Sequence, residues 1–367
     1  MKPQGPATGR PLPGRRGMAP RIERKPQAVQ SMQALVCVEP GTLRLEQRPI
    51  PVADPAHVLV RPRRVGVCGT DYHIYEGKHP FLQYPRVMGH ELAVEAVEAP
   101  AGSGIRPGEI FAVNPYISCG SCVACRRGKP NCCVQVSVLG VHEDGGMAGF
   151  LVVPPGNLVR APGLTLDQCA MVEFLAIGAH AVRRGAVSKE DRVLVVGAGP
   201  IGLGVAIFAR LSGASVAVLD QDEARVVTAR AVAAATTFVA DPGGLAALIS
   251  HTGGEGFDVV FDATGSAHAM QKGFDHVAHG GRYVLVSVVK DAISFMDPDF
   301  HRKELTLLGS RNATAQDFER VISAIGDNPA YFDRLVTHRT DLPGAVRDIP
   351  LWATQKTELI KAVIEIQ

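Results

Sequence analysis

Residues 192–202 read Arg-Val-Leu-Val-Val-Gly-Ala-Gly-Pro-Ile-Gly, and no other stretch says as much about the architecture. An apolar run ends at Gly197, and Gly197, Gly199 and Gly202 form a G-x-G-x-x-G pattern before another apolar segment. This order predicts a strand, a tight turn and a helix over 200–212. The first glycine permits the turn, the second lets the backbone approach a pyrophosphate, and the third allows close packing of the helix on the strand. The free N–H groups at the start of the helix would bind the phosphates.

The segments around this turn continue the alternation of strand and helix. The expected strands are 192–196, 215–220, 257–262, 281–287 and 305–308, and the further expected helices are 222–235 and 267–278. Strands separated by helices of about 10–15 residues are typical of βαβ units and of a doubly wound parallel sheet. We therefore expect an α/β domain over residues 181–316.

Asp220 ends the second of these strands, 18 residues after Gly202. A carboxylate in this place can accept hydrogen bonds from the adenosine ribose of a dinucleotide, and it repels a 2′-phosphate. The sequence therefore predicts NAD rather than NADP. The structural alternative is a glycine-rich turn without a ligand in an ordinary parallel sheet.

The sequence before residue 181 has a different texture. From Met32 to about residue 180 it consists of short β-rich pieces punctuated by Pro and Gly, for example 56–63, 109–113 and 150–153. After the parallel sheet, a helix is expected at 316–325 and a β-rich tail at 357–366, which we expect to pair back onto the first part. The sequence thus predicts an irregular β-rich domain built from residues 32–180 and 317–367.

Length, composition and charge agree with this division. A chain of 367 residues is too long for one core of usual size, and 46% hydrophobic with 20% charged residues excludes wholesale disorder. Residues 1–31 carry seven basic residues, one acidic residue and no apolar run, which predicts a disordered basic extension rather than a signal peptide. The remaining residues carry a formal charge of −4, which argues against a nucleic-acid binder. The uncharged run 193–209 is short and interrupted by Gly and Pro, which argues against a membrane span.

Four cysteines lie at short, regular spacing within an almost entirely polar segment. Cys119, Cys122, Cys125 and Cys133 give C-x2-C-x2-C-x7-C. Four thiolates can close a tetrahedron around zinc, and such a site has no open position, so it would order a lobe rather than catalyse. Free thiols and a nucleic-acid zinc ribbon are the alternatives. Clustered thiols also favour a reducing compartment, so we expect a cytoplasmic protein.

A second set of metal-ligand residues is spread more widely. Cys68 lies in Val-Cys-Gly-Thr-Asp-Tyr-His, and His90 and Glu91 follow in Met-Gly-His-Glu. One thiolate, one imidazole and one carboxylate would leave zinc an open position for a substrate oxygen. Glu173 is a second carboxylate that could take or share the third position. Taken singly, each residue is more often a core or surface residue than a ligand.

Together these motifs resemble the zinc-dependent medium-chain alcohol dehydrogenase family, from about Met32 to the C-terminus. The family's GHE motif matches Gly89-His90-Glu91, and its zinc lobe, C-x2-C-x2-C-x2-G-x2-N-x-C, ends at Cys133 rather than Cys132. The resemblance implies a GroES-like catalytic domain beside a Rossmann domain. It also implies two zinc ions per chain, NAD and a homo-oligomer, either a dimer or a tetramer.

Within the family, the polyol branch is the most similar. Glu173 matches a zinc-site glutamate of sorbitol-dehydrogenase-like enzymes, and Arg225 follows Asp220 by five residues as in their adenosine pocket. The stretches NCCVQVSVLGVHEDGG, DPDFHRKELTLLGSRNAT and TELIKAVI resemble bacterial L-galactonate or L-gulonate 5-dehydrogenases more closely still. The sequence departs from the family pattern at Phe174 and 147–149, and from the sorbitol dehydrogenases at Ile74 and Asn312.

The resemblance implies that zinc polarises a secondary alcohol and that hydride passes to the nicotinamide. Thr70 and His73 match the family's proton relay, and Asp71 would orient a ligand or the relay. Arg311 follows the last expected strand of the parallel sheet, where it could grip a sugar-acid carboxylate or several hydroxyls; an interdomain salt bridge is its alternative. Pro200, Ile201, Arg225, Val286 and Ser287 complete the cofactor-binding candidates.

Other functions stay open at this level. Cys-Gly-Thr-Asp-x-His-Ile also suits threonine 3-dehydrogenases, and a plain polyol dehydrogenase is a further enzyme alternative. A non-enzymatic alternative is a zinc-stabilised protein that binds NAD but has lost the chemistry. The basic extension could also bind RNA or lipid, which would make binding sensitive to salt.

Overall fold

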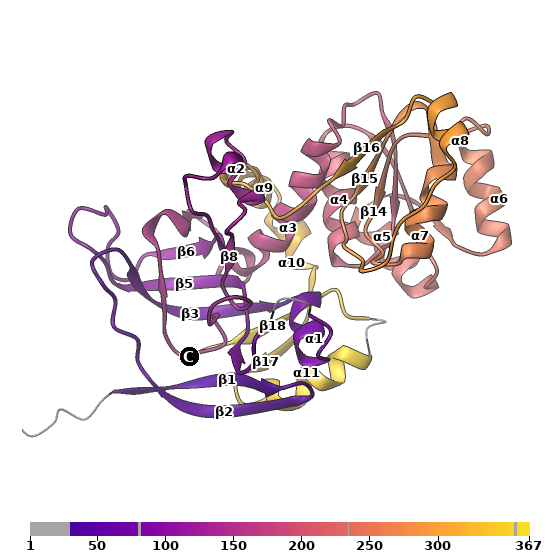
Figure 1. Cartoon of the computed structure of the whole chain (residues 1–367). Helices are drawn as coiled ribbons and strands as arrows, with labels where there is room; N and C mark the ends of the chain where they lie inside the picture. The colour runs from indigo at the N-terminus through magenta and orange to yellow at the C-terminus, as the bar shows by residue number, and fades with distance from the viewer. Residues whose placement is uncertain (1–29, 80–81, 234, 356–357) are drawn as a thin grey trace, which may run out of the picture.

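The computed structural model describes residues 30–79, 82–233, 235–355 and 358–367, and these form two bodies (Figure 1). The extension expected over 1–31 lies outside the described residues apart from Gln30 and Ser31, and Ser31 already belongs to a strand. Within the described ranges, none of the helices combines the length and the apolar character needed to cross a membrane.

One body is a six-stranded sheet in the order β13-β12-β11-β14-β15-β16, in which all neighbours are parallel. The expected doubly wound α/β domain is therefore confirmed. Its strands are β11 (Arg192–Val196), β12 (Ser215–Asp220), β13 (Thr236–Val239), β14 (Phe257–Asp262), β15 (Val277–Leu285) and β16 (Thr306–Gly309). Its helices are α4 (Pro200–Leu211), α5 (Glu223–Ala233), α6 (Pro242–His251), α7 (Ala267–Gly273) and α8 (Asp297–Arg302).

Two details of this body differ from the expectation. Strand β13 has no counterpart among the expected strands, because it is short and follows an Ala-rich run that is typical of a helix. The helix expected over 267–278 ends at Gly273, where the buried ring of Tyr283 leaves no room for a side chain. A 3-10 turn then leads into β15 at Val277, so the strand starts earlier than expected.

The other body contains a mixed sheet in the order β10-β6-β5-β3-β18-β17, with β9 paired to β3, and a small sheet in the order β2-β1-β4. The C-terminal strand β18 pairs with β3, with Ala362 opposite Val67, so the expected return of the tail is confirmed. The strands are β1 (Ser31–Glu39), β2 (Thr42–Pro49), β3 (Val58–Val67), β4 (Arg86–Val87), β5 (Glu91–Glu98), β6 (Ile110–Val113), β7 (Tyr116–Ile117), β8 (Ser137–Val138), β9 (Leu151–Val153), β10 (Leu158–Arg160), β17 (Val336–Asp341) and β18 (Lys361–Glu365). The helices beside them are α1 (Gly69–Tyr75), α2 (Val123–Arg126), α9 (Ala315–Asp327), α10 (Pro329–Asp333) and α11 (Ala345–Thr354).

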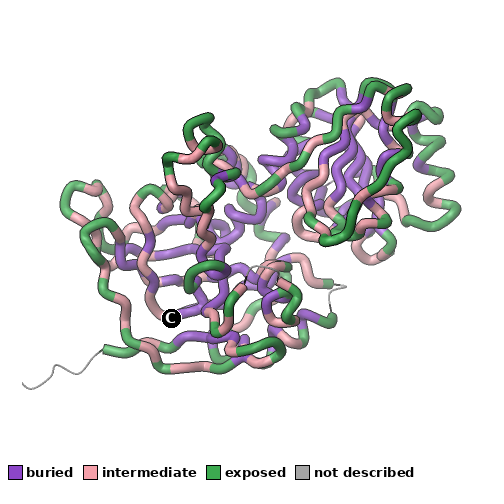
Figure 2. Tube along the Cα trace, viewed as in Figure 1, coloured by how far each residue is buried: buried purple, intermediate pink, exposed green. Residues whose placement is uncertain are grey.

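A long helix, α3 (Leu166–Arg184), lies between the two sheets (Figure 1). It corrects the expectation that short β-rich pieces continue to residue 180. The signal for its start is local, since Thr165 and Gln168 form a reciprocal capping box. At Gly178 the helix crosses α4 so closely that a side chain would collide with the backbone of Gly204. Figure 2 shows that α3 and the inner strands, such as β5, β11 and β14, are largely buried, whereas the edge strands β16 and β17 are more exposed.

Candidate active site

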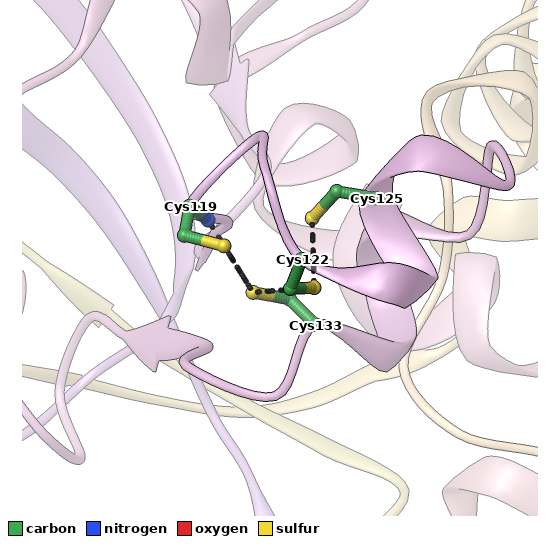
Figure 3. A group of neighbouring side chains, drawn as sticks. All are labelled: Cys119, Cys122, Cys125 and Cys133. Atoms are coloured by element: carbon green, nitrogen blue, oxygen red, sulfur yellow. Dashed lines mark hydrogen bonds between the residues drawn. The ribbon is translucent and has the colours of Figure 1, made fainter.

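The four spaced cysteines come together in the loop that carries α2 (Figure 3). Their sulfurs lie within 4.8 Å of one another, and the distances from Cys122 to Cys125 and from Cys133 to Cys119 are both 3.5 Å. A tetrahedron with zinc about 2.3 Å from each sulfur places the sulfurs about 3.8 Å apart, so the donor set fits zinc. Cys132 is exposed, whereas Cys133 is buried, which agrees with the preference for Cys133.

The lobe also favours the charged form of one of these sulfurs. Hydrogen bonds from the backbone N–H groups of Cys125 and Val134 lower the pKa of Cys122 to about 6. A thiolate, not a thiol, is the form that binds metal. The backbone of the lobe therefore favours the thiolate at Cys122, whereas burial raises the pKa of Cys125 to about 11.

Replacing Cys122 by Ser should destabilise the lobe while leaving the rest of the chain folded with its other metal. We expect a fall in zinc content from two to one per chain and a lower melting temperature, because structural zinc contributes directly to folding free energy. Metal analysis and thermal denaturation of the purified protein measure both. The exposed Cys132→Ser is the matched control and should change neither. Unchanged stability together with one zinc per chain before and after the change would argue against a structural zinc.

The second set of donors meets where β3 ends and β5 begins. Donor atoms of Cys68, His90 and Glu91 lie within 4.8 Å of one another. Cys68 caps the N-terminus of α1, and Gly89, with φ +93, turns the chain into β5. Among the described residues, Nδ1 of His90 is buried without a hydrogen-bond partner. A thiolate, an imidazole and a carboxylate within this distance of one another fit a zinc site with an open position.

Asp71 ties the two segments of this site together. Its carboxylate accepts hydrogen bonds from the backbone N–H of Cys68 at 2.9 Å and of Gly89 at 3.3 Å, and it lies 3.8 Å from Nδ1 of His90. It is completely buried, and burial raises its pKa although His90 and both N–H groups act in the opposite direction. Asp71 thus lies behind the donors, where it can orient them.

Glu91 is held from behind by a lysine that sequence reasoning missed. Both oxygens of Glu91 accept from Nζ of Lys361, at 2.7 and 2.6 Å, and both residues are buried. The same ammonium lies 4.3 Å from the ring centre of Phe174, the residue at which the chain departs from the family pattern. The sequence signal that could have pointed to Lys361 is that it is the lone lysine among the apolar residues of Leu359–Ile364.

Glu173 lies near this group but does not join it. The hydroxyl of Tyr116, a second residue that sequence reasoning missed, donates a hydrogen bond to Glu173. Burial raises the pKa of Glu173 to about 7, and the neighbouring charges of His90 and Glu91 act on it in opposite directions. The described structure therefore gathers Cys68, His90 and Glu91 more tightly than Glu173.

Two histidines near the site have basic neighbours. Burial, followed by the charges of His142, His73, His90 and Lys290, lowers the pKa of His79. Burial, followed by Arg86 and Arg311, lowers the pKa of His142. The lowered pKa favours the neutral form of both imidazoles, so they add no positive charge to the surroundings of His90 at neutral pH. Of the relay candidates, Thr70 is half-buried and His73 is exposed.

The glycine turn has the expected geometry. Gly197 has φ +99, which suits glycine, and a Cβ at Gly202 would collide with the carbonyl oxygen of Gly197. A Cβ at Gly199 would meet nothing of the protein within 4 Å, so this glycine leaves open space at the N-terminus of α4. Such a cradle fits a pyrophosphate. Pro200 and Ile201 begin α4 beside it.

Asp220 lies directly beneath this turn. Its oxygens accept from the backbone N–H of Ala198 at 2.6 Å and of Asp222 at 2.9 Å, which leaves further lone pairs for ribose hydroxyls. Arg225 is half-buried on α5 and lies 4.0 Å from Asp222. Val286 and Ser287 follow β15, and their N–H groups donate to the carbonyl of Asp262. All these candidates stand near the carboxyl ends of parallel strands, where ligands of such sheets bind.

Comparisons with known proteins agree with this geometry. Residues 54–163 match the alcohol dehydrogenase GroES-like domain, and residues 200–327 match the zinc-binding dehydrogenase family. The chain is 40% identical over 340 residues to L-galactonate-5-dehydrogenase of Escherichia coli (strain K12), covering 92% of this chain and 99% of that protein. It is 32% identical over 316 residues to sorbitol dehydrogenase of Halalkalibacterium halodurans, covering 84% of this chain and 92% of that protein.

A solved structure has a similar fold. It is a short chain alcohol dehydrogenase (rspB) from Escherichia coli CFT073 complexed with NADH, with a TM-score of 0.85 at 29% identity, covering 92% of this chain and 99% of that chain. Both matched domains and the zinc-compatible donor groups lie in the described fold. The chain therefore belongs to the zinc-binding alcohol dehydrogenase family and is an oxidoreductase that acts on CH–OH donors.

Proposed function

We propose that this chain oxidises a secondary alcohol of a sugar acid, of the L-galactonate or L-gulonate type, to a ketone with NAD as the hydride acceptor. The observation that carries the proposal is the 40% identity to an L-galactonate-5-dehydrogenase, which covers 92% of this chain. Arg311, an exposed residue just after β16, supports the same substrate class, because its guanidinium can bind the carboxylate of a sugar acid but has no ionic partner in a neutral alditol.

Cys68, His90 and Glu91 would hold the catalytic zinc, with Glu173 beside them as a second carboxylate. When bound, zinc supplies a Lewis acid that polarises the substrate oxygen and lowers the pKa of the alcohol. Asp71 holds the backbone on both sides of the donors, and Lys361 holds Glu91. These contacts keep the donor set in place without help from the substrate.

The chain's other residues would bind, orient and move protons. The N–H groups around Gly199 receive the pyrophosphate, and Asp220 accepts from the ribose hydroxyls. Thr70 is half-buried and His73 is exposed, so together they offer the proton of the substrate hydroxyl a route from the site to solvent. Arg311, just after β16, would bind the carboxylate of the substrate with charge-assisted hydrogen bonds.

A substrate panel tests the proposal. The protein, with its zinc content measured, is incubated with NAD and L-galactonate, L-gulonate, galactitol, sorbitol or threonine, and NADH formation gives kcat/KM for each. We expect the aldonates to be the best substrates. Much faster oxidation of alditols would assign the chain to the polyol branch, which its similarity to a sorbitol dehydrogenase also supports. Turnover of threonine alone would exclude both. The homo-oligomer and the cytoplasmic location stay predictions, of which light scattering checks the first.

The Asp220→Ser variant should raise the KM for NAD and relax the discrimination against NADP. The carboxylate loses its bonds to the ribose, and the repulsion of a 2′-phosphate disappears. The loss of charge-assisted bonds corresponds to about 1.5–3 kcal/mol, or about 10- to 150-fold in kcat/KM for NAD. Steady-state kinetics with both dinucleotides measures the ratio. Asp327→Ser is the control, because Asp327 is an exposed carboxylate at the end of α9, and it should keep the NAD preference. A wild-type protein that already prefers NADP would contradict this interpretation of the pocket.

A further inference from the structure

Asn131 connects the cysteine lobe to the segment that carries Arg311. It lies in the 3-10 turn Pro130–Cys132 inside the lobe and is 4% exposed. Its side-chain amide donates to the carbonyl oxygen of Arg311 at 2.9 Å and lies 3.2 Å from Nε2 of His180. The amide has two N–H groups, so each of these partners can receive one. Two residues after Asn131 comes Cys133, one of the four lobe cysteines.

The partner of Asn131 on α3 is itself fixed. Nδ1 of His180 lies 2.8 Å from a carboxylate oxygen of Asp317, and both residues are buried. Asp317 also accepts from Arg183 at 2.8 and 2.9 Å, and from the backbone and hydroxyl of Thr314. Nη2 of Arg183 lies 3.0 Å from the same Nδ1 and donates to the same carboxylate oxygen of Asp317. The carboxylate favours the proton on Nδ1, which leaves Nε2 as an acceptor for Asn131. The ring therefore fixes the orientation of the Asn131 amide.

The contact between the lobe and this segment is reciprocal. The side-chain amide of Asn312 donates to the backbone carbonyl of Asn131 at 3.2 Å. Asn312 has φ +52, a left-handed conformation that asparagine tolerates better than most residues. Residues 311 and 312 are therefore held by two hydrogen bonds to one lobe residue, one through a backbone carbonyl and one through a side chain.

We propose that Asn131 is a positioning residue for Arg311: the folded cysteine lobe fixes the backbone of 311–312, and through it the direction of the Arg311 guanidinium. The substrate contact of Arg311 rests on the proposed function, whereas the link between lobe and segment rests on the hydrogen bonds alone. Because Asn131 belongs to the chain segment that closes the lobe, loss of lobe order should release the segment as well. A zinc ion held by four cysteines has no open position for substrate, but through Asn131 the lobe would still influence substrate recognition.

Hydrogen exchange of the intact, zinc-loaded protein tests the link without any substrate. We expect the peptide covering 310–314 to exchange about tenfold faster in Asn131→Ala, and also faster in Cys122→Ser, which alters the lobe alone. Asn312→Gly is the second variant, because glycine accepts the positive φ and only the amide is removed. Asn157→Ala is the matched control, since Asn157 also donates to two backbone carbonyls, those of Asn114 and Tyr116, without contacting 311–312. It should leave exchange at 310–314 unchanged.

Kinetics then tests the consequence for recognition. Asn131→Ala should raise the KM for the aldonate about three- to tenfold, the effect of one neutral hydrogen bond, with kcat and the KM for the alditol little changed. In the Arg311→Ala background the same substitution should change the aldonate KM by less than about twofold, because the contact it supports is already absent. Asn312→Gly should act in the same direction.

The outcomes separate this inference from the proposed function. Unchanged exchange at 310–314 in both Asn131→Ala and Asn312→Gly overturns the link, whatever the kinetics show. Faster exchange with an unchanged aldonate KM, while Arg311→Ala lowers aldonate turnover, overturns the positioning role and leaves the proposed function standing. If Arg311→Ala lowers kcat/KM equally for the aldonate and the alditol, Arg311 does not bind the substrate carboxylate, and Asn131 then has no effect on recognition through it. Hydrogen exchange at 310–314 still decides whether Asn131 holds this segment.

Discussion

The Lys361→Met variant is expected to lose about 3–5 kcal/mol of its free energy of unfolding, because the change leaves the carboxylate of Glu91 buried without its counter-charge. Lys361 is 1% exposed and Glu91 is fully buried, so water cannot replace the ammonium. Nζ also donates to the carbonyl of Val67 at 3.3 Å and lies over the ring of Phe174, and both contacts are lost. Chemical denaturation of the metal-free protein, prepared with a chelator so that no zinc ion compensates Glu91, measures the difference.

A double-mutant cycle separates the ion pair from packing. Glu91→Gln combined with Lys361→Met removes both charges, so the double variant should be clearly less destabilised than the sum of the single variants. The exposed Lys189→Met, whose side chain is 79% exposed, is the control and should change stability by no more than about 0.5 kcal/mol. A single variant as stable as this control, or a double variant that equals the sum, would contradict the description of Lys361 as the counter-charge of Glu91.

The ion pair also shows what could be predicted from sequence. The turn at Gly197–Gly202 and the cysteines at 119–133 are contiguous patterns, so their spacing alone predicts their geometry. Glu91 and Lys361 are separated by 270 positions, and no local pattern joins them. Only the pairing of β18 with β3 brings Lys361 to the site, and that pairing depends on the packing of the whole sheet.

The helix α3 is the second limit of prediction from sequence. Its residues are apolar on nearly all sides, because they pack against β5 and β6 and also against α4 and α9, so the periodic polar face of a surface helix is missing. The sequence offers Glu173 as a second carboxylate for the zinc site, but its contact with Tyr116 depends on where α3 runs. The network around His180 and Asp317 depends on α3 and α9 in the same way.

The Arg311→Ala variant should lower kcat/KM for L-galactonate or L-gulonate substantially more than for galactitol or sorbitol. In an aldonate oxidised at C5 the carboxylate lies four carbons from the reacting carbon, within reach of an arginine at the edge of the site. Loss of one charge-assisted hydrogen bond costs about 1.5–3 kcal/mol, which corresponds to about 10- to 150-fold in kcat/KM. For the alditol only a neutral contact disappears, so its loss should be much smaller. Steady-state kinetics on both substrates measures the ratio.

The side chain of Arg311 is exposed, so its removal should not unfold the protein, and a lower aldonate rate can be assigned to binding. Arg302→Ala is the matched control, because Arg302 is an exposed arginine of the parallel-sheet body that pairs with Asp299 at 3.1 Å. It should leave the ratio of aldonate to alditol turnover unchanged. High salt should weaken aldonate binding to the wild type, because it screens the attraction between the guanidinium and the carboxylate, and this salt effect should be smaller in Arg311→Ala. Equal losses on acid and alditol would mean that Arg311 binds hydroxyls or holds the two bodies together.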